Sequence, residues 1–161
     1  CIRDSPCPVE PGYRQTCIGR QSVCKAPDER NTWKLEIFGF RMVHWNDNDS
    51  VSFTIDLLKP ETLNTLTLGC ITNNGMAIHK PSSVKVEVSD DNSSFCEAAM
   101  RSFTPEEIFR EGNFIENLPL KLRGTQARYV RVTAKGPGVC PASHVRPGQV
   151  SRILFDEMIL E

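Results

Sequence analysis

The stretch Val51-Ser-Phe-Thr-Ile-Asp-Leu57 alternates apolar and polar residues without interruption. Successive side chains of a β-strand point to opposite faces, so this pattern predicts a strand with one face in a core and the other in solvent. The same period of two recurs at 66–70, 84–88, 118–122 and 128–134, and a last apolar run at 153–155 leads to 158–160. The sequence therefore predicts several short, half-buried strands.

Clusters of residues that favour turns separate these runs. Gly, Pro, Asn, Asp and Ser interrupt regular structure, each for its own steric or hydrogen-bonding reason. The clusters are Lys59-Pro60, Asn73-Asn74-Gly75, Lys80-Pro81, the polar run 89–94 and Gly136-Pro-Gly138. Only 105–110 has the composition of a helical turn. Many short strands joined by turns are typical of an all-β sandwich or barrel.

Length and composition are those of an ordinary globular domain. The chain has 161 residues, of which 39% are hydrophobic and 24% charged, and this length fits one domain with a small appendage. The net charge is −1 and the basic residues are scattered, which argues against nucleic acid as a partner. No apolar run approaches the roughly 18 residues of a membrane helix. Because the chain starts at Cys1, we expect a processed or excised piece of a longer protein.

Seven cysteines are many for this length, and four of them fall within the first 24 residues. Zinc is the alternative to disulfides, but there is no Cys-x-x-Cys pair, and we expect His44, His79 and His144 to sit apart from the cysteines. We therefore expect disulfides, with an odd thiol left over or bridged to another part of the parent protein, in an extracellular protein. The N-terminal cysteines, for which three pairings are possible, are Cys1, Cys7, Cys17 and Cys24.

The cysteines also suggest a division of the chain. Residues 1–26 are rich in Cys, Pro and Gly and have no period, whereas 27–161 carry the alternating pattern. We expect a cysteine-rich N-terminal segment followed by the β-sandwich. The segment is either a wrap stapled onto the sandwich or the end of a small cysteine-rich repeat. Two glycosylation sequons, at Asn48 and Asn92, are compatible with a secreted glycoprotein.

Five sequence motifs occur in an order that resembles a known family. They are Phe38-Gly-Phe40, the run 51–57, Pro81-Ser-Ser-Val-Lys-Val-Glu-Val-Ser-Asp-Asp91, Ala127-Arg-Tyr-Val-Arg-Val132 and Phe155-Asp-Glu-Met-Ile-Leu160. This order resembles the galactose-binding-like fold of discoidin domains, coagulation factor (F5/8) C-type domains and family 32 carbohydrate-binding modules. The resemblance covers about residues 26–161 and implies an antiparallel jelly-roll β-sandwich.

The C-terminal part is also similar to the last module of bacterial family 20 β-N-acetylhexosaminidases. The similarity lies in 127–135, Cys140-Pro141, His144, Gly148 and 155–157. In those enzymes the catalytic barrel is a separate, upstream domain. The present chain departs from them in its cysteine-rich start and in Ser143, where an aromatic residue is expected before the histidine.

The family resemblance implies a structural Ca²⁺ site. The segment Ala26-Pro-Asp28-Glu-Arg-Asn31-Thr32-Trp33 resembles the loop that surrounds calcium in relatives, although it is one residue shorter and has Glu29 in place of a glycine. Ca²⁺ takes roughly six to eight oxygen ligands. The resemblance carries over to Asp28, Thr32 and Glu157 as metal ligands. The alternative is an exposed capping aspartate and a surface glutamate.

In this fold, ligands bind to loops at one end of the sandwich. A sugar site combines an aromatic platform with a few polar groups, which favours the loop at 44–48 as the centre of the site. Trp45 would stack on a sugar, whereas in the alternative each candidate residue only fills or stabilises a loop. The candidate ligand-binding residues are His44, Trp45, Asn46, Asp47, Asn74, His79, His144 and Arg146.

No catalytic signature for a nucleophile, phosphate loop, metalloprotease or dinucleotide occurs in the sequence, so we do not expect an enzyme. We expect a non-catalytic carbohydrate-binding module of a secreted or cell-surface multidomain protein, with a glycan or glycoprotein as its partner. The alternative is an extracellular adhesion or receptor-type discoidin domain that binds a protein. A membrane lipid partner would need exposed apolar loop tips, for which Met76-Ala-Ile78 with Lys80 is the sole candidate, and lipid is not expected.

Overall fold

The computed structural model describes residues 14–16, 23–24, 33–36 and 50–161. Within these ranges the chain is mostly antiparallel β-sheet with almost no helix, and no helix is long and apolar enough to span a membrane. The elements are β1 (Arg14–Thr16), β2 (Val23–Cys24), β3 (Trp33–Glu36), β4 (Ser50–Asn73), η1 (Asn74–Met76), β5 (Ser83–Ser89), β6 (Cys96–Ser102), α1 (Pro105–Ile108), β7 (Asn113–Lys135) and β8 (Phe155–Leu160).

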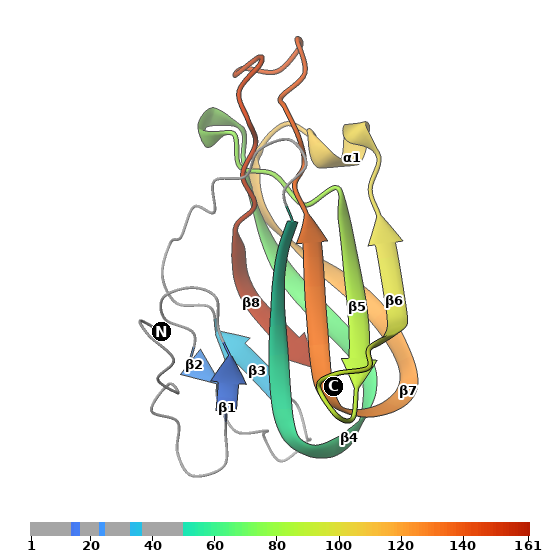
Figure 1. Cartoon of the computed structure of the whole chain (residues 1–161). Helices are drawn as coiled ribbons and strands as arrows, with labels where there is room; N and C mark the ends of the chain where they lie inside the picture. The colour runs from blue at the N-terminus through green and yellow to red at the C-terminus, as the bar shows by residue number, and fades with distance from the viewer. Residues whose placement is uncertain (1–13, 17–22, 25–32, 37–49) are drawn as a thin grey trace.

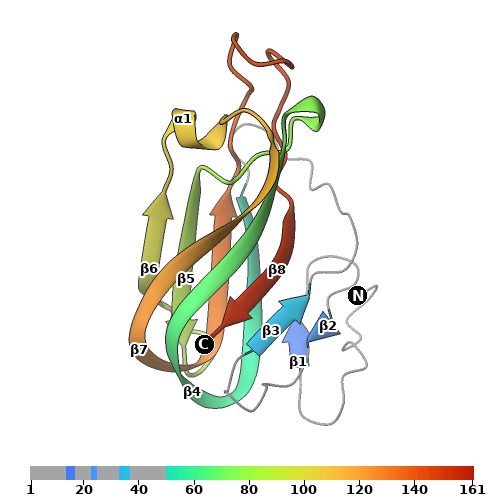
Figure 2. The same cartoon turned by 180° about the vertical axis from the view of Figure 1, so that it is seen from behind.

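Two long strands, β4 and β7, build both layers of a sandwich. They pair with each other from end to end, from Ser50 opposite Lys135 to Asn73 opposite Asn113. The first half of β4 and the second half of β7 lie in one layer with β1, β5 and β6. The remaining halves lie in the other layer with β8, β3 and β2. Figures 1 and 2 show the two layers from opposite sides.

Both long strands change layer at the same end of the molecule. The register between them shifts between Asp56 and Glu61 and again between Leu63 and Thr65. Such irregularities bend a strand and increase its twist. Leu58 and Arg123 adopt left-handed backbone angles, with φ of 69° and 57°. The Lys59-Pro60 pair, which the sequence predicts as a turn between two strands, therefore forms a corner inside one continuous strand.

The core lies between the layers and is made by the alternating residues. The apolar positions of the predicted strands are buried, apart from the half-buried Val51, Phe53 and Phe155, which pack against the core; this confirms the assignment of their inward faces. The absence of polar atoms at these positions lets the two layers approach face to face. The most deeply buried members are Leu57, Leu63, Leu66, Leu68, Val84, Val86, Leu118, Leu122, Val130, Val132 and Leu160.

The predicted helical turn is confirmed as α1, at Pro105–Ile108. Thr104 caps it: its hydroxyl accepts a hydrogen bond from the Glu107 amide, and the Glu107 carboxylate accepts one from the Thr104 amide. This reciprocal pair satisfies two amides that a helix start otherwise leaves unpaired. Ile108 then points into the core.

The predicted N-terminal segment contributes strands to the sandwich. Arg14–Thr16 pair with Thr54–Asp56 of β4, and Val23–Cys24 pair with β3. The predicted boundary at residue 26 and the pairing of the N-terminal cysteines lie outside the described residues.

Three cysteines in the described part of the chain are free thiols: Cys70, Cys96 and Cys140. The expected disulfides of the N-terminal cysteines, with one odd thiol left over or bridged elsewhere, stay a prediction. Cys70 lies in the core, Cys96 is exposed on β6, and Cys140 is buried in the long connection to β8. The three positions are on separate elements.

Candidate functional site

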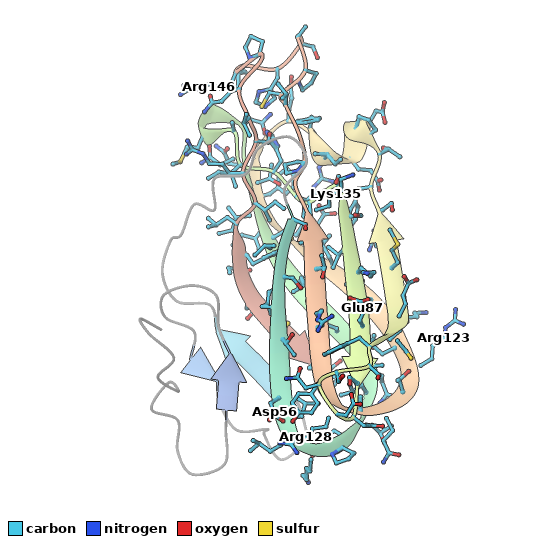
Figure 3. The ribbon with its side chains drawn as sticks, viewed as in Figure 1. Asp56, Glu87, Arg123, Arg128, Lys135 and Arg146 are labelled. Carbon is cyan, nitrogen blue, oxygen red and sulfur yellow. The ribbon has the colours of Figure 1, made fainter. Side chains whose placement is uncertain are left out.

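Several irregular segments of the described chain lie at one end of the sandwich. The 74–76 turn (η1), α1 and the connection 136–152 all lie at this end (Figure 1), which we call the loop end. The corner of β4 and β7 lies at the opposite end, where Figure 3 shows Asp56 and Arg128 far from Arg146.

The backbone at the loop end is tied together by hydrogen bonds between segments that are distant in sequence. The Asn73 and Ile78 backbones bond each other in both directions, at 2.8 and 3.0 Å. The His79 amide donates to the Arg152 carbonyl at 2.9 Å, and the Arg152 amide donates to Ala77 at 2.9 Å. These bonds attach the η1 turn to the end of the 136–152 connection. The side chains that they carry are therefore held in fixed relative positions.

The 136–152 connection is itself a compact hairpin-like loop. The Cys140 amide donates to Gln149 and the Ser151 amide to Gly138, each at 2.9 Å. At its tip, the His144 amide donates to the Pro141 carbonyl at 3.0 Å. Gly148 has a φ of 74°, a backbone conformation that glycine adopts without steric cost. The loop therefore positions Cys140 and His144 by its own backbone.

His79, Phe109 and His144 form an aromatic cluster beneath the loop end. The His79 ring centroid lies 5.1 Å from that of Phe109 and 4.9 Å from that of His144, in edge-on arrangements. His79 is fully buried and His144 nearly so. Burial lowers the pKa of His79 to about 4, His144 adds to this shift, and the Ile108 backbone opposes it. The imidazole of His79 is therefore neutral at neutral pH.

The histidine nitrogens in this cluster are only partly satisfied. Within the described part of the chain, neither ring nitrogen of His79 makes a hydrogen bond of good geometry, although the Ile108 carbonyl lies close enough to raise the pKa of the ring. Nε2 of His144 also has no partner there. Nδ1 of His144 accepts a hydrogen bond from the Arg146 amide at 3.0 Å. Buried polar atoms without partners are uncommon and call for a physical explanation.

Cys140 lies beside the two histidines, which the sequence analysis did not anticipate. The ligand atoms of His79, Cys140 and His144 all lie within 4.8 Å of one another, and the Cys140 thiol also lies 3.3 Å from the Ser151 hydroxyl. The prediction that the histidines sit apart from the cysteines is therefore wrong for these three. The spacing Cys-x-x-x-His at 140–144 was the available signal, but His79 reaches the cluster only through the fold.

Arg146 is the exposed member of the predicted ligand-binding set. Its Nε donates to the Gly75 carbonyl at 2.9 Å, so the side chain bridges the 136–152 loop and η1. Met76 and Val145 are also exposed here, at 51% and 66% of their full surface. The outer surface of the loop end, as far as it is described, therefore combines a guanidinium with apolar side chains.

The other predicted ligand residues of the described chain lie below that surface. Asn74, His79 and His144 are all buried. Asn74 belongs to a turn that Asn73 closes by accepting a hydrogen bond from the Met76 amide at 3.1 Å. Buried side chains cannot stack on a ligand at the surface, so these three occupy a supporting position. The remaining predicted residues, His44, Trp45, Asn46 and Asp47, lie outside the described residues.

The segment proposed for lipid contact does not form an apolar tip. Ala77, Ile78 and Lys80 are buried, and only Met76 is exposed. The Lys80 ammonium lies 2.6 Å from the Glu116 carboxylate and above the Phe103 ring. Lys80 cannot rim an exposed apolar patch because its charge is paired in the interior. The structure thus removes the basis for that alternative.

Of the three predicted calcium ligands, only Glu157 lies in the described part of the chain. Glu157 lies half-buried in the middle of β8, opposite Glu36 of β3, and its amide donates to the Asp156 carboxylate at 2.8 Å. Asp28 and Thr32 lie outside the described residues, so the calcium site stays a prediction.

No protein-family model matches the sequence, and no curated protein sequence matches it. Solved structures do match. A family 32 carbohydrate-binding module (CBM32-3) from a family 31 glycoside hydrolase of Clostridium perfringens is 19% identical, with a TM-score of 0.50 over 83% of this chain and 76% of the module. CBM32-1 of a Clostridium perfringens family 31 glycoside hydrolase (13% identity, TM-score 0.43, 84% and 81% covered) is also similar. The C-terminal domain of a Bacteroides fragilis chitobiase is similar too, at 14% identity and a TM-score of 0.42, over 70% of this chain and 63% of that domain.

The first of these likenesses establishes the fold. The chain has the galactose-binding-like β-sandwich of the family 32 modules, which confirms the predicted fold class. At this identity the likeness does not extend to a ligand, because one fold serves many functions.

Proposed function

We propose that this chain is a non-catalytic carbohydrate-binding module of a secreted or cell-surface protein, and that it binds glycans at the loop end. The observation that carries the proposal is the likeness to a carbohydrate-binding module, in a sandwich whose loop end presents an anchored, exposed arginine. Calcium, if bound through Asp28, Thr32 and Glu157, would have a structural role.

Arg146 is suited to sugar hydroxyls. Its Nε is engaged by the Gly75 carbonyl, which restricts the side chain before a ligand arrives. A guanidinium has five donor hydrogens, so the remaining ones are available to ring and hydroxyl oxygens. Pre-ordering lowers the entropic cost of binding, which matters for ligands that are strongly hydrated.

An aromatic platform is the second requirement of a sugar site. Among residues 50–161, every aromatic side chain is buried or half-buried. The half-buried Phe114 ring, at the start of β7, is covered by the Arg110 guanidinium at 4.0 Å. Trp45 is therefore our proposed platform, with His44, Asn46 and Asp47 as hydrogen-bonding partners.

A glycan-array screen of the whole chain tests the proposal, beside Trp45→Ala and Arg146→Ala. Arg123→Ala is the matched control, because Arg123 is an exposed arginine at the opposite end of the sandwich. We expect binding to a defined glycan set that either loop-end substitution weakens at least about tenfold, a loss of roughly 1.4 kcal/mol, and that the control leaves unchanged. Binding that survives both substitutions would move the site away from the loop end.

The second candidate function is an adhesion or receptor-type domain that binds a protein. The exposed Met76 and Val145 beside Arg146 favour it, because methionine and arginine are enriched in protein interfaces. No binding on the array by the folded chain, together with capture of an extracellular protein that Arg146→Ala abolishes, would select this function instead.

A further inference from the structure

The buried group of His79, Cys140 and His144 has the composition of a transition-metal site. One thiol and two imidazoles are the ligand types of zinc centres. Their ligand atoms lie within 4.8 Å of one another. Zinc bonds of about 2.0–2.3 Å place ligand atoms about 3.5 Å apart, so the three side chains need to close by roughly 1 Å. Side-chain rotations supply a movement of that size.

Three of the four ring nitrogens at this site make no hydrogen bond of good geometry among the described residues, and this distinguishes the group from ordinary core packing. His79 is fully buried, and both of its ring nitrogens are without such a hydrogen bond among the described residues. Nε2 of His144 is in the same condition. Phe109 packs edge-on to His79 and cannot accept a hydrogen bond in the ring plane. A cation between the two rings would bind one nitrogen of His79 and Nε2 of His144.

The backbone holds the three residues in place without a metal. His79 is fixed by the bond from its amide to Arg152, Cys140 by the bond to Gln149, and His144 by the bond to Pro141. Metal binding to a preformed site does not have to order the chain, and so more of the coordination energy appears as affinity. The carboxylate-rich composition that Ca²⁺ requires is absent from this trio, because it offers nitrogen and sulfur rather than oxygen.

From these observations we propose that His79, Cys140 and His144 bind a divalent transition-metal ion of the Zn²⁺ type, which braces the loop end. Two side chains come from the 136–152 connection and one from the segment between η1 and β5, so the ion would cross-link two segments of the loop end. The proposal does not depend on glycan binding, because its readout is the metal itself.

The hydrogen bond from the Arg146 amide to Nδ1 of His144 makes a further prediction. Nδ1 accepts this bond, so the proton of the neutral ring is on Nε2. When Nε2 binds the metal, that proton moves to Nδ1 and the Arg146 hydrogen bond breaks. The Cys140 thiol releases one proton to solvent when it becomes a thiolate ligand. The Arg146 amide should therefore report metal binding directly.

The test is a titration of the full, reduced chain with Co²⁺, followed by displacement with Zn²⁺. We expect one equivalent to bind with the ligand-field bands of tetrahedral Co²⁺ and a sulfur-to-cobalt charge-transfer band. Cys140→Ser should abolish the charge-transfer band and weaken Zn²⁺ binding by more than about a hundredfold, the upper range for loss of an outer-shell partner. Cys96→Ser, which removes an exposed thiol on β6, is the matched control and should bind as the wild type does.

The four N-terminal cysteines are the competing ligands, and the same variants separate them. A charge-transfer band and a Zn²⁺ affinity that are unchanged in Cys140→Ser would assign the metal to those thiols and overturn the proposal. An absence of binding by the folded wild type would overturn it as well, and would leave the trio as an aromatic cluster with a neighbouring thiol.

A second measurement covers variants that fail to fold, which is a concern for the buried His79. In the wild type, Zn²⁺ should slow alkylation of Cys140 at least about tenfold, raise the melting temperature by mass action and shift the amide resonance of Arg146. Alkylation and melting that Zn²⁺ leaves unchanged would count against the site without any substitution.

Discussion

Replacing Asp56 by alanine removes the anchor of the corner at which β4 passes from one layer to the other. The Arg128 Nε and Nη2 atoms donate to the two oxygens of Asp56 at 2.8 and 3.0 Å. The Leu58 amide, in a residue with left-handed backbone, donates to the same carboxylate at 2.8 Å. A single side chain thus joins β7 to the bend of β4.

The loss in stability can be worked out from these contacts. A hydrogen bond to a charged group contributes about 1.5–3 kcal/mol when its partner is buried, but the Arg128 side chain is 37% exposed and Asp56 15%, so solvent screens the pair. We assign about 1 kcal/mol to the arginine pair and about 1 kcal/mol to the Leu58 amide. Asp56→Ala should lower the free energy of unfolding by about 2 kcal/mol.

The assay is urea unfolding of the wild type, Asp56→Ala, Arg128→Ala and the double variant at neutral pH. The double-mutant cycle isolates the pair, because the Leu58 amide is lost in both Asp56 backgrounds. We expect a coupling energy of about 1 kcal/mol that decreases with added salt. A coupling energy indistinguishable from zero would refute this account of the corner.

The same pair predicts a pH dependence. Burial raises the pKa of Asp56, but the hydrogen bonds from Arg128 and Leu58, with the arginine charge, outweigh it and leave the pKa below its ordinary value. The stabilisation is therefore complete above the unfolded pKa of about 3.9 and is lost as the pH falls through the lower folded value. The stability difference between wild type and Asp56→Ala should be constant from about pH 5 to 8 and shrink in acid. A difference that grows in acid would contradict the sign.

Three further predictions concern the core and the thiols. Leu68→Ala, at a fully buried site, should lower the unfolding free energy by about 3 kcal/mol in urea titrations, and a loss under about 1 kcal/mol would contradict the burial. Gly69→Ala should lower the unfolding free energy by about 1–2 kcal/mol, because a Cβ there would collide with the Asp156 carboxylate. Adding Asp156→Ala to this variant should recover part of the lost stability. No recovery would mean that the collision is not the cause. When the native protein is alkylated, peptide mapping should find Cys96 modified and Cys70 intact. Cys96 is exposed, whereas Cys70 is buried and burial raises the pKa of its thiol. Equal alkylation rates at the two cysteines would contradict this prediction.

Which residues face the core could be predicted from the amino-acid sequence. The alternation at 51–57, 84–88 and 118–122 is a local property, since a strand exposes its side chains with a period of two wherever it lies. The helical turn α1 could be predicted because it also depends on local interactions: Thr104 and Glu107 bond each other within one turn. Lys59-Pro60 was predicted as a break between strands, but pairing with β7 on both sides carries β4 through it as a bent, continuous strand.

Contacts between side chains that are distant in the sequence follow from the tertiary fold. Asp56 finds Arg128 because β4 and β7 lie side by side at the corner, and His79 finds Cys140 and His144 because backbone bonds attach the η1 turn to Arg152. No periodic pattern in the sequence predicts these contacts, because they depend on how long connections fold back rather than on neighbouring residues. The strands follow from the local pattern of apolar and polar residues. The candidate sites depend on hydrogen bonds and strand pairing between segments that are distant in the sequence.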